Sequence, residues 1–442
     1  MRVTEEPGAP VVIDFPDFLG VRIFQPVEAS RMAKMDVCYF KTNLKKYNKY
    51  DIEKLAYKKI ASLTFYHADL EHLKEFKALV MGRFYEQQEP MLERRYDESS
   101  DMYYYKRVLV LLNPCAGKSR AEKMFENIHP FLKANGMLVK LVITKPDKYC
   151  VRLIEEMEKT ELLSYDFILC LSGDGIPHEV LNGYMRRRDI DFKSEKLTLA
   201  MLPAGSGCAL LENCMKIGKN ATTLDNAIYS LCHLKRKAFN ISKYHYTCHD
   251  DTQGDIYSFL SASYGYMADV DIYSEKLRFM GRARFDVYGA FKIMKVSTYN
   301  IALEYSEQKE AELPEITEPR DEDERKTIKD EVFLVFIADL PYISTEYRAC
   351  PMVENLSDGR VNVQLFEKQN GRIKLARLMM GHTAHNPTNN HGLKEFLLES
   401  FKLTLDPKPY KRNLVIDGET YSHIPIKFIE RFNTKTSFYS LI

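Results

Sequence analysis

The chain has 442 residues, of which 45% are hydrophobic and 28% are charged, and its formal net charge is +1. This length favours two or three domains over a single one. The near-zero charge excludes an overall basic field that would recruit nucleic acid, so any attraction to a membrane surface must be local.

The cysteines, the N-terminus and the lengths of the apolar runs indicate in which cellular compartment the protein works. The nine cysteines include no CxxC pair, which favours free thiols in a reducing compartment over a disulfide scaffold. The N-terminus has early acidic residues and lacks the basic and apolar regions of a signal peptide. No apolar run reaches the ~18 residues that a spanning helix needs. We therefore expect a cytoplasmic protein that associates with membranes peripherally without crossing them.

Residues 1–100 are predicted to form a small α+β extension followed by a polar linker. Residues 37–43 and 61–68 alternate like strands. The linker is predicted over residues 87–101. Strands that end in one amphipathic helix are typical of the tail of a pleckstrin-homology fold. The helix before the linker is predicted because these apolar residues share one helical face: Leu70, Leu73, Phe76, Leu79, Val80 and Phe84.

Residues 101–240 are predicted to form an α/β domain with an open parallel sheet. The run 108–112 is continuously apolar, as expected of a buried parallel strand. Strands and helices then alternate along the chain, which implies helices on both faces of the sheet. The predicted strands are 108–112, 137–144, 165–173 and 197–205, and the predicted helices are about 119–134, 148–162 and 177–185.

Residues 241–442 are predicted to form a β-rich domain with an antiparallel sheet or sandwich. Most of its apolar runs alternate and are separated by turns. One helix is expected at residues 394–401, and the acidic, proline-containing tract at about 306–330 is predicted to be a solvated, mobile insertion. The predicted strands are 256–265, 298–306, 331–340, 360–368, 400–407 and 413–420.

The first candidate site follows the predicted strand 108–112. The run Asn113-Pro-Cys-Ala-Gly117-Lys118-Ser119 contains GKS, but a P-loop would require glycine at position 112, which is leucine. A strand, a turn and a helix N-terminus remain, and the unpaired amide groups of such a terminus can bind phosphate. The alternative is a simple strand-to-helix turn capped by Ser119.

A second turn, Ser172-Gly173-Asp174-Gly175, ends the strand 165–173, where open α/β sheets bind their ligands. Glycine lets a phosphate group approach the backbone closely. Asp174 is therefore placed to accept a proton from an alcohol or to help hold a metal ion. Glu179 is expected to orient local backbone or Mg²⁺-bound water, whereas His178 is favoured as a packing residue.

The third turn, Ala204-Gly205-Ser206-Gly207-Cys208, joins the strand 197–205 to the start of a helix and is another candidate phosphate site. Each glycine-rich turn is weak evidence alone. Three such turns at the ends of three strands of one parallel sheet should meet at one edge. Their combination favours a single nucleotide site over three unrelated loop turns.

Together, the three turns resemble the catalytic-domain signature of the diacylglycerol-kinase-like lipid kinases. The segment 265–285 narrows the resemblance to the sphingosine kinases, with its pattern Ala-Asp-Val-Asp, then Ser-Glu-Lys, then spaced arginines. The resemblance covers residues 105–442, resuming at Asp358-Gly359 and ending at Asp417-Gly418-Glu419. It implies transfer of the γ-phosphate of ATP, with Mg²⁺, to the primary hydroxyl of sphingosine or a related sphingoid base.

The resemblance also implies roles for individual residues. Asp174 would be the general base for the lipid hydroxyl. Asp271, with Asp269 beside it, would bind the amine-bearing head group of the lipid. No residue is assigned as a metal ligand. The nucleotide would be surrounded by Asn113, Gly117, Lys118, Ser119, Thr144, Gly173, Gly175, Glu179, Gly205, Ser206, Gly207, Arg278, Arg284, Asp417, Gly418 and Glu419.

Physical chemistry agrees with these implied roles. The guanidinium group of arginine holds phosphate oxygens bidentately and keeps its charge. A carboxylate such as Asp271 suits the ammonium group of a sphingoid base, whereas a neutral glyceride would leave it unpaired at a cost. The alternative for Asp269, Asp271, Arg278 and Arg284 is a solvated, charge-laced helix surface.

Three residues depart from the family pattern. Cys115 and Ala116 precede Gly117 where the family usually has two glycines, and Cys208 replaces the usual asparagine. Loss of the asparagine removes an amide that could cap a helix, at a cost of about 1 kcal/mol. We expect Cys115 and Cys208 to be buried small residues and the enzyme to be active.

Other functions remain open alternatives. A ceramide or diacylglycerol kinase of the same fold is the nearest, and a soluble NAD kinase with a Gly-Asp-Gly turn is more distant. The altered residues also allow a non-catalytic, lipid-binding pseudokinase scaffold. We expect the β-rich domain to contact a bilayer, at Tyr342-Ile343 or in the loop 382–391, and a homodimer is a further expectation.

Overall fold

The structure is a computed structural model in which the chain forms two compact units that are interleaved in sequence. Unit 1 contains residues 1–176, 197–237 and 439–442, and unit 2 contains residues 177–196 and 238–438. The structure describes residues 2–3, 11–12, 18–24, 33–46, 54–67, 70–88, 94–97, 102–117, 120–146, 148–205, 207–280, 283–295, 297–306, 325–344, 347–368, 372–374, 376, 392–405, 414–421 and 426–441.

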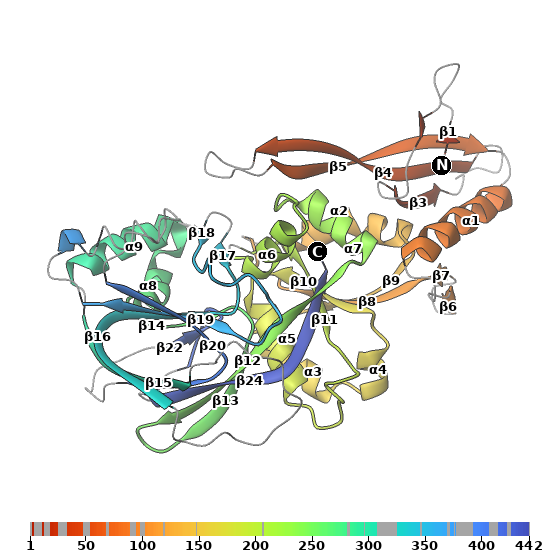
Figure 1. Ribbon diagram of the computed structural model, residues 1–442. Helices are drawn as coiled ribbons and strands as arrows, with labels where there is room; N and C mark the ends of the chain where they lie inside the picture. Colours follow the sequence, from red (N-terminus) through yellow and green to blue (C-terminus); the bar gives the residue numbers. More distant parts are fainter. Residues whose placement is uncertain are drawn as a thin grey trace. The chain divides into compact units, whose positions relative to one another are not determined.

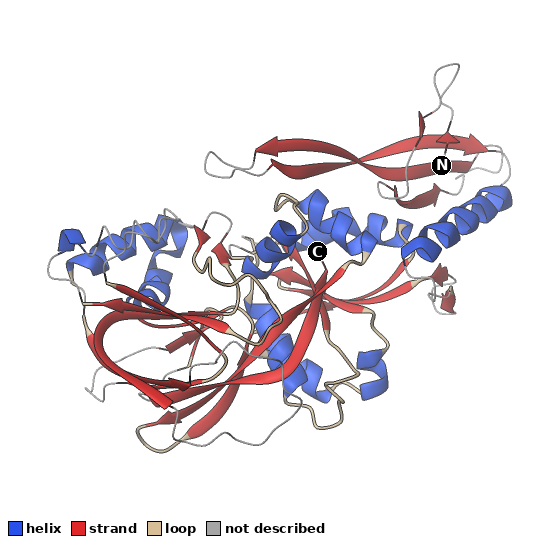
Figure 2. Ribbon diagram, in the orientation of Figure 1, coloured by secondary structure: helices blue, strands red, loops and turns tan. Residues whose placement is uncertain are grey.

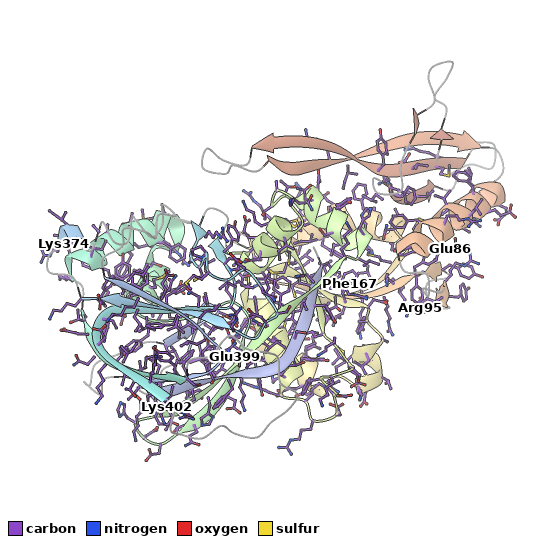
Figure 3. All side chains as sticks on the ribbon, viewed as in Figure 1. Glu86, Arg95, Phe167, Lys374, Glu399 and Lys402 are labelled. Carbon is purple, nitrogen blue, oxygen red and sulfur yellow. The ribbon has the colours of Figure 1, made fainter. Side chains whose placement is uncertain are left out.

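Unit 1 contains the predicted parallel sheet, in the order β9-β8-β10-β11. Figure 1 shows α2, α6 and α7 on one face of these strands and α3 and α4 on the other. Apolar side chains such as Phe167, labelled in Figure 3, fill the sheet interior. The strands are β8 (Lys106–Leu112), β9 (Met137–Ile143), β10 (Phe167–Ser172) and β11 (Thr198–Pro203), and the helices are α2 (Ala121–Ala134), α3 (Tyr149–Glu156), α4 (Lys159–Leu163), α6 (Ala209–Ile217) and α7 (Leu224–His233).

The predicted alternation of strands and helices is confirmed, with one correction. The single helix predicted at residues 148–162 is two helices, because Met157 and Glu158 adopt extended backbone angles between α3 and α4. The break lets Ile154 and Leu162 both be buried.

Residues 1–100 form a three-stranded antiparallel sheet and a helix, as shown by colour in Figure 2. The likeness to a pleckstrin-homology fold stays a prediction. Part of the predicted linker folds, because β6 and β7 form a short hairpin. The elements are β1 (Arg2–Val3), β2 (Val11–Val12), β3 (Phe18–Phe24), β4 (Ala33–Lys46), β5 (Lys54–His67), α1 (Leu70–Gln88), β6 (Arg95–Asp97) and β7 (Met102–Tyr104).

This extension packs on the α/β sheet's helices around Asn135, which follows α2. The Asn135 side-chain amide donates to the carbonyl of Leu19, and its Oδ1 and carbonyl oxygens accept from the Tyr85 hydroxyl at 2.8 and 2.6 Å. A Cβ atom on Gly20 would lie 2.5 Å from the Ala134 carbonyl carbon. The extension is therefore built into unit 1 by buried, directional contacts.

Unit 2 is rich in strands, as predicted, and their pairing within this unit is antiparallel. Its core contains side chains such as Tyr244, Leu303, Val335 and Val363. The sandwich form stays a prediction. The strands are β13 (Gln253–Ser258), β14 (Ser261–Gly265), β15 (Tyr299–Ser306), β16 (Arg325–Ala338), β17 (Tyr342–Ser344), β18 (Tyr347–Arg348), β19 (Val361–Glu367), β20 (Leu393–Leu398), β21 (Phe401–Leu405), β22 (Leu414–Ile416) and β23 (Glu419–Thr420).

Three elements run from one unit into the other. They are α5 (Gly175–Met185), β12 (Arg236–Cys248) and β24 (Ile426–Leu441). In unit 1, Thr198 and Leu199 of β11 pair in parallel with Tyr439 and Ser440 of β24.

Two predictions for unit 2 are wrong in part. The helix expected at residues 394–401 is strand β20, which pairs with β19 and directs Phe396 and Leu398 toward the core. Residues 325–330 of the predicted insertion extend β16 beside β15. Pairing with a neighbouring strand overrides local propensity in both cases. Residues 307–324 lie outside the described residues.

The segment 266–294 is helical, which the sequence patterns did not predict. It contains α8 (Tyr266–Ser274), a 3₁₀ helix (Glu275–Met280) and α9 (Ala283–Met294). Helix α8 packs on β14, and α9 packs on α8. Among the helices in the described part of the chain, none is both long and apolar enough to cross a membrane.

Candidate functional site

Four turns of unit 1 begin where the four parallel strands end. Asn113 follows β8, Thr144 follows β9, Gly173 follows β10, and Ala204 follows β11. Because the strands are parallel, their carboxyl ends share one edge of the sheet. Amide hydrogen bonds tie neighbouring turns to that edge, such as Gly205 N–H to the Ser172 carbonyl at 3.1 Å.

The glycines of these turns are needed because the turns contact one another. A Cβ atom on Gly205 would lie 2.5 Å from the Gly173 Cα atom, and one on Gly173 would lie 2.7 Å from the Gly207 carbonyl oxygen. Gly117 has a positive φ of 57°, and a Cβ atom there would overlap the Ala204 carbonyl oxygen. The structure thus brings the three glycine turns together.

Asp174 lies half-buried among these turns and caps helix α6. Its Oδ2 accepts from the amide of Ala209 at 2.8 Å, and its Oδ1 accepts from the amide of Leu210 at 3.1 Å. A helix N-terminus stabilises negative charge through its unpaired amides. Each carboxylate oxygen can accept more than one hydrogen bond.

The N-terminus of α6 contains Cys208, one of the residues that depart from the family pattern. Cys208 is the N-cap residue of α6, and its side chain makes no capping hydrogen bond. Asp174 supplies the cap from a different turn. The expectation that Cys115 and Cys208 are buried is wrong, because Cys115 is exposed and Cys208 is half-buried. The Cys115 amide donates to Asn113 Oδ1 at 2.9 Å and fixes the first turn.

The acidic and basic candidates on α8 and α9 belong to unit 2. Asp269 is buried and accepts from Lys292 Nζ at 2.6 Å, so it has a cationic partner within the protein. Asp271 is half-buried on the same helix. The guanidinium carbon of Arg284 lies 4.5 Å from the centroid of the Phe285 ring. The Arg278 side chain lies outside the described residues.

Asp417 is the most heavily hydrogen-bonded of the candidate residues. Its carboxylate accepts from the Ser258 hydroxyl at 2.7 Å and from three consecutive amides, at 3.1 Å for Phe259 and 3.0 Å each for Leu260 and Ser261. The side chain is fully buried. Asp417 therefore holds its own turn in place, whereas Gly418 and Glu419 beside it are exposed.

His178 is more than the packing residue favoured from the sequence. Its Nδ1 lies 2.9 Å from Asp417 Oδ2, and its Nε2 contacts the Tyr421 hydroxyl. Burial raises the pKa of Tyr421 further above its ordinary value, and the charges of Asp417 and Glu419 act in the same direction. No local pattern links residues 178 and 417, and the only sequence signals are their places beside the motifs at Asp174 and Glu419.

The other candidates are placed less completely. Gly175 is the first residue of α5, Glu179 is half-buried on it, and Thr144 is buried. Lys118, Ser119 and Ser206 lie outside the described residues. In the described part of the chain, no three acidic, histidine or cysteine side chains gather as a metal site.

Comparison with known proteins matches residues 107–244 to the diacylglycerol kinase catalytic domain. The chain is 35% identical over 205 residues to sphingosine kinase 1 of Mus musculus, covering 45% of this chain and 52% of the relative. It is 33% identical over 249 residues to sphingoid long chain base kinase 5 of Saccharomyces cerevisiae, covering 55% and 33%. The matched part therefore spans about half of these relatives or less.

The fold has a solved counterpart. The crystal structure of a diacylglycerol kinase from Bacillus anthracis superposes with a TM-score of 0.54 at 18% identity, covering 76% of this chain and 96% of that one. The resemblance to sphingosine kinases and to diacylglycerol-kinase-like enzymes is confirmed by these matches. Residues 107–244 match the diacylglycerol kinase catalytic domain, and the chain is similar to the sphingosine kinases.

Proposed function

We propose that the protein is an ATP-dependent lipid kinase that phosphorylates the primary hydroxyl of a sphingoid base such as sphingosine. The observation that carries the proposal is the meeting of three glycine turns beside Asp174, within the segment that matches a kinase catalytic domain. The similarity to sphingosine kinases supports the choice of lipid. The protein would work in the cytoplasm and at membrane surfaces.

The nucleotide would bind at the carboxyl edge of the parallel sheet. Strand ends that lead through glycine turns into helices are the kind of site that binds phosphate groups. Asn113, Gly117, Thr144 and Gly207 would line it, with Lys118, Ser119 and Ser206 in the same turns. Mg²⁺ usually binds through substrate phosphates and one or two carboxylates, and it would neutralise charge on the transferred phosphoryl group.

Asp174 would accept the proton of the lipid hydroxyl while the amides of α6 hold it in position. Phosphoryl transfer depends chiefly on in-line positioning and on neutralising charge. Arg278 and Arg284 would supply positive charge, and Glu419 would contact the nucleotide. These roles rest on the resemblance, and the geometry at Asp174 supports the first of them.

Asp271 would recognise the ammonium group of the lipid. The resemblance assigns this role to Asp271, and Asp269 on the same helix accepts from Lys292 Nζ at 2.6 Å. The decisive assay supplies labelled ATP and Mg²⁺ with sphingosine, dihydrosphingosine, ceramide or diacylglycerol. Turnover of the two sphingoid bases alone supports the proposal, and turnover of ceramide or diacylglycerol instead contradicts it.

We expect Asp271→Asn to raise the KM for sphingosine at least tenfold, because a charge-assisted hydrogen bond of about 1.5–3 kcal/mol is lost. The change keeps the size of the side chain and removes its charge. Asp250→Asn, in an exposed turn of unit 2, is the matched control and should keep the KM of the wild type. An unchanged KM in Asp271→Asn would rule out amine recognition by this residue.

The pseudokinase alternative makes a different prediction for the same assay. A scaffold without chemistry would give wild-type turnover no greater than that of Asp174→Ala. The alternative is motivated by Cys115-Ala116 and Cys208, and this comparison of turnover decides between the two.

Membrane contact is proposed at α9 in addition to the regions named from the sequence. Val287, Phe291 and Met294 lie on one face of this helix, and each is about half exposed. Lys276 and Lys295 are exposed nearby in sequence and would attract anionic head groups. Because the proposed substrate is a membrane amphiphile, the occupant of this face would be a bilayer. Tyr342-Ile343 begins β17, and the loop 382–391 lies outside the described residues.

We expect Phe291→Ser to lower binding to vesicles that contain anionic phospholipid about five- to tenfold, since an inserted aromatic side chain contributes on the order of 1 kcal/mol or more. Leu79→Ser is the matched control, because Leu79 is an exposed apolar residue of α1 in unit 1. Pelleting with vesicles measures both. Equal pelleting of Phe291→Ser and the wild type would exclude this face.

A further inference from the structure

The turn that contains Asp417 is a two-residue loop between β22 and β23. Asp417 and Gly418 have consecutive positive φ angles of 50° and 83°, and Asp-Gly is a preferred sequence for a hairpin turn of this shape. The surroundings of the turn also hold the Asp417 side chain in place. The surroundings here are the Ser258 hydroxyl and three successive amides that donate to the Asp417 carboxylate.

One further donor reaches this carboxylate from helix α5. His178 is 2% exposed, and its Nδ1 lies 2.9 Å from Asp417 Oδ2. A carboxylate can only accept, so Nδ1 carries the proton. On the other side of the ring, Nε2 hydrogen-bonds the Tyr421 hydroxyl, and the Asn182 side-chain nitrogen lies 3.3 Å from it. The imidazole ring therefore contacts both ends of the turn.

Helix α5 is itself fixed on β13 one helical turn later. The Asn182 side chain donates to the Tyr257 carbonyl at 2.8 Å and accepts from the Tyr257 amide at 3.0 Å. These two hydrogen bonds resemble the paired backbone hydrogen bonds between neighbouring antiparallel strands. They prevent the helix from rotating about its axis. His178 is consequently held on a rigid face, and the Asp417 turn is held by His178.

Both ring nitrogens of His178 are engaged within the protein, and the ring is buried. A general acid or base must reach the reacting proton, so His178 is unsuited to proton transfer with a substrate. Its effect must act through the turn that it holds. The exposed residue on that turn is Glu419, whose strand β23 pairs with β22.

We propose that His178 is a positioning residue that fixes the Asp417–Glu419 turn against helix α5 and thereby sets the affinity for the nucleotide. The inference rests on the proposed function, in which Glu419 contacts ATP. Helix α5 begins one residue after Asp174, the proposed base. The same helix contains His178, which holds the turn. The orientation of Glu419 would depend on an imidazole that never touches the substrate.

Three variants separate the two hydrogen bonds. His178→Ala removes both of them. His178→Asn places an amide nitrogen near the position of Nδ1 and keeps the donor to Asp417. Tyr421→Phe removes only the hydroxyl that bonds Nε2. Tyr184→Phe is the control, because it loosens the same helix by removing the hydrogen bond from the Tyr184 hydroxyl to the Glu195 carbonyl.

The readouts are the KM for ATP, kcat, the dissociation constant of a fluorescent ATP analogue and the midpoint of thermal unfolding. His178→Ala should raise the KM for ATP and the dissociation constant about tenfold, with a smaller change in kcat. His178→Asn should stay within about threefold of the wild type. Tyr184→Phe should lower the thermal midpoint while the KM for ATP changes little.

Two results would overturn the inference. One is an unchanged nucleotide affinity in His178→Ala, and the other is a loss in His178→Asn equal to that in His178→Ala. If His178→Ala does not fold, His178→Asn and Tyr421→Phe still test the inference. Each keeps one of the two hydrogen bonds, so each should weaken nucleotide binding by less than the tenfold expected when both are lost. A wild type that binds the ATP analogue but phosphorylates no sphingoid base would refute the proposed function and leave this inference standing.

Discussion

Gly205→Ala is expected to lower kinase activity by at least 100-fold and to destabilise unit 1. The added methyl group would lie 2.5 Å from the Gly173 Cα atom and 2.9 Å from the Ser172 carbonyl carbon. Both are backbone atoms, which cannot rotate away as a side chain could. The two turns must therefore separate, and a displacement of about 1 Å at a reacting centre can cost about 100-fold in rate.

The measurement is turnover of labelled ATP together with the midpoint of thermal unfolding. Overpacking of this kind costs about 1–3 kcal/mol, so the midpoint should also fall. Gly82→Ala is the matched control, since a Cβ atom there lies 3.7 Å from the Tyr105 hydroxyl in ordinary contact within α1. Activity of Gly205→Ala within tenfold of the wild type would show that close contact between the turns is not required.

The sequence predicted the parallel sheet well for a physical reason. The strands β8, β10 and β11 are buried on both faces, so their apolar runs are continuous and are followed by turn residues. Each strand thus marks its own ends, and parallel pairing then brings the turns of Gly117, Gly173 and Gly205 to one edge. The meeting of these three turns could therefore be predicted without coordinates.

Unit 2 was harder because its elements depend on neighbours that are distant in the sequence. Residues 394–398 contain both charged and apolar side chains, and only pairing with β19 selects a strand. The helices α8 and α9 were missed because their apolar residues face several directions at once. Phe291 is exposed, whereas Ala268 of α8 is buried. In α8 a single stripe of apolar residues, the usual helical signal, is therefore missing, and in α9 the stripe of Val287, Phe291 and Met294 is exposed.

In the candidate site too, sequence patterns do not reveal contacts between residues that are distant in the sequence. Sequence patterns indicated Asp174 and Asp417 but not their partners. Asp174 receives amides that are 35 and 36 residues away, and His178 reaches Asp417 across 239 residues. Local motifs report which side chains are present at a turn. They do not report which backbone groups the fold delivers to them.

Asp174→Ala is expected to lower activity at least 1,000-fold, and the loss has two separable parts. General base catalysis contributes typically 100- to 10,000-fold. The Ala209 and Leu210 amides also lose their acceptor at the N-terminus of α6, and loss of an N-cap costs about 0.5–2 kcal/mol. The variant should therefore be both inactive and less stable.

A second change at the same helix end separates these two parts. Cys208 occupies the N-cap position of α6 without capping it, and serine is a favoured N-cap residue of nearly the same size. The double variant Asp174→Ala/Cys208→Ser should regain about 1 kcal/mol of stability, seen as a higher thermal midpoint than that of Asp174→Ala. Its activity should stay at least 100-fold below that of Cys208→Ser alone, because serine restores the cap and not the base. If activity returned together with stability, Asp174 would be needed only to begin a helix, and its part in accepting the lipid's proton would be excluded.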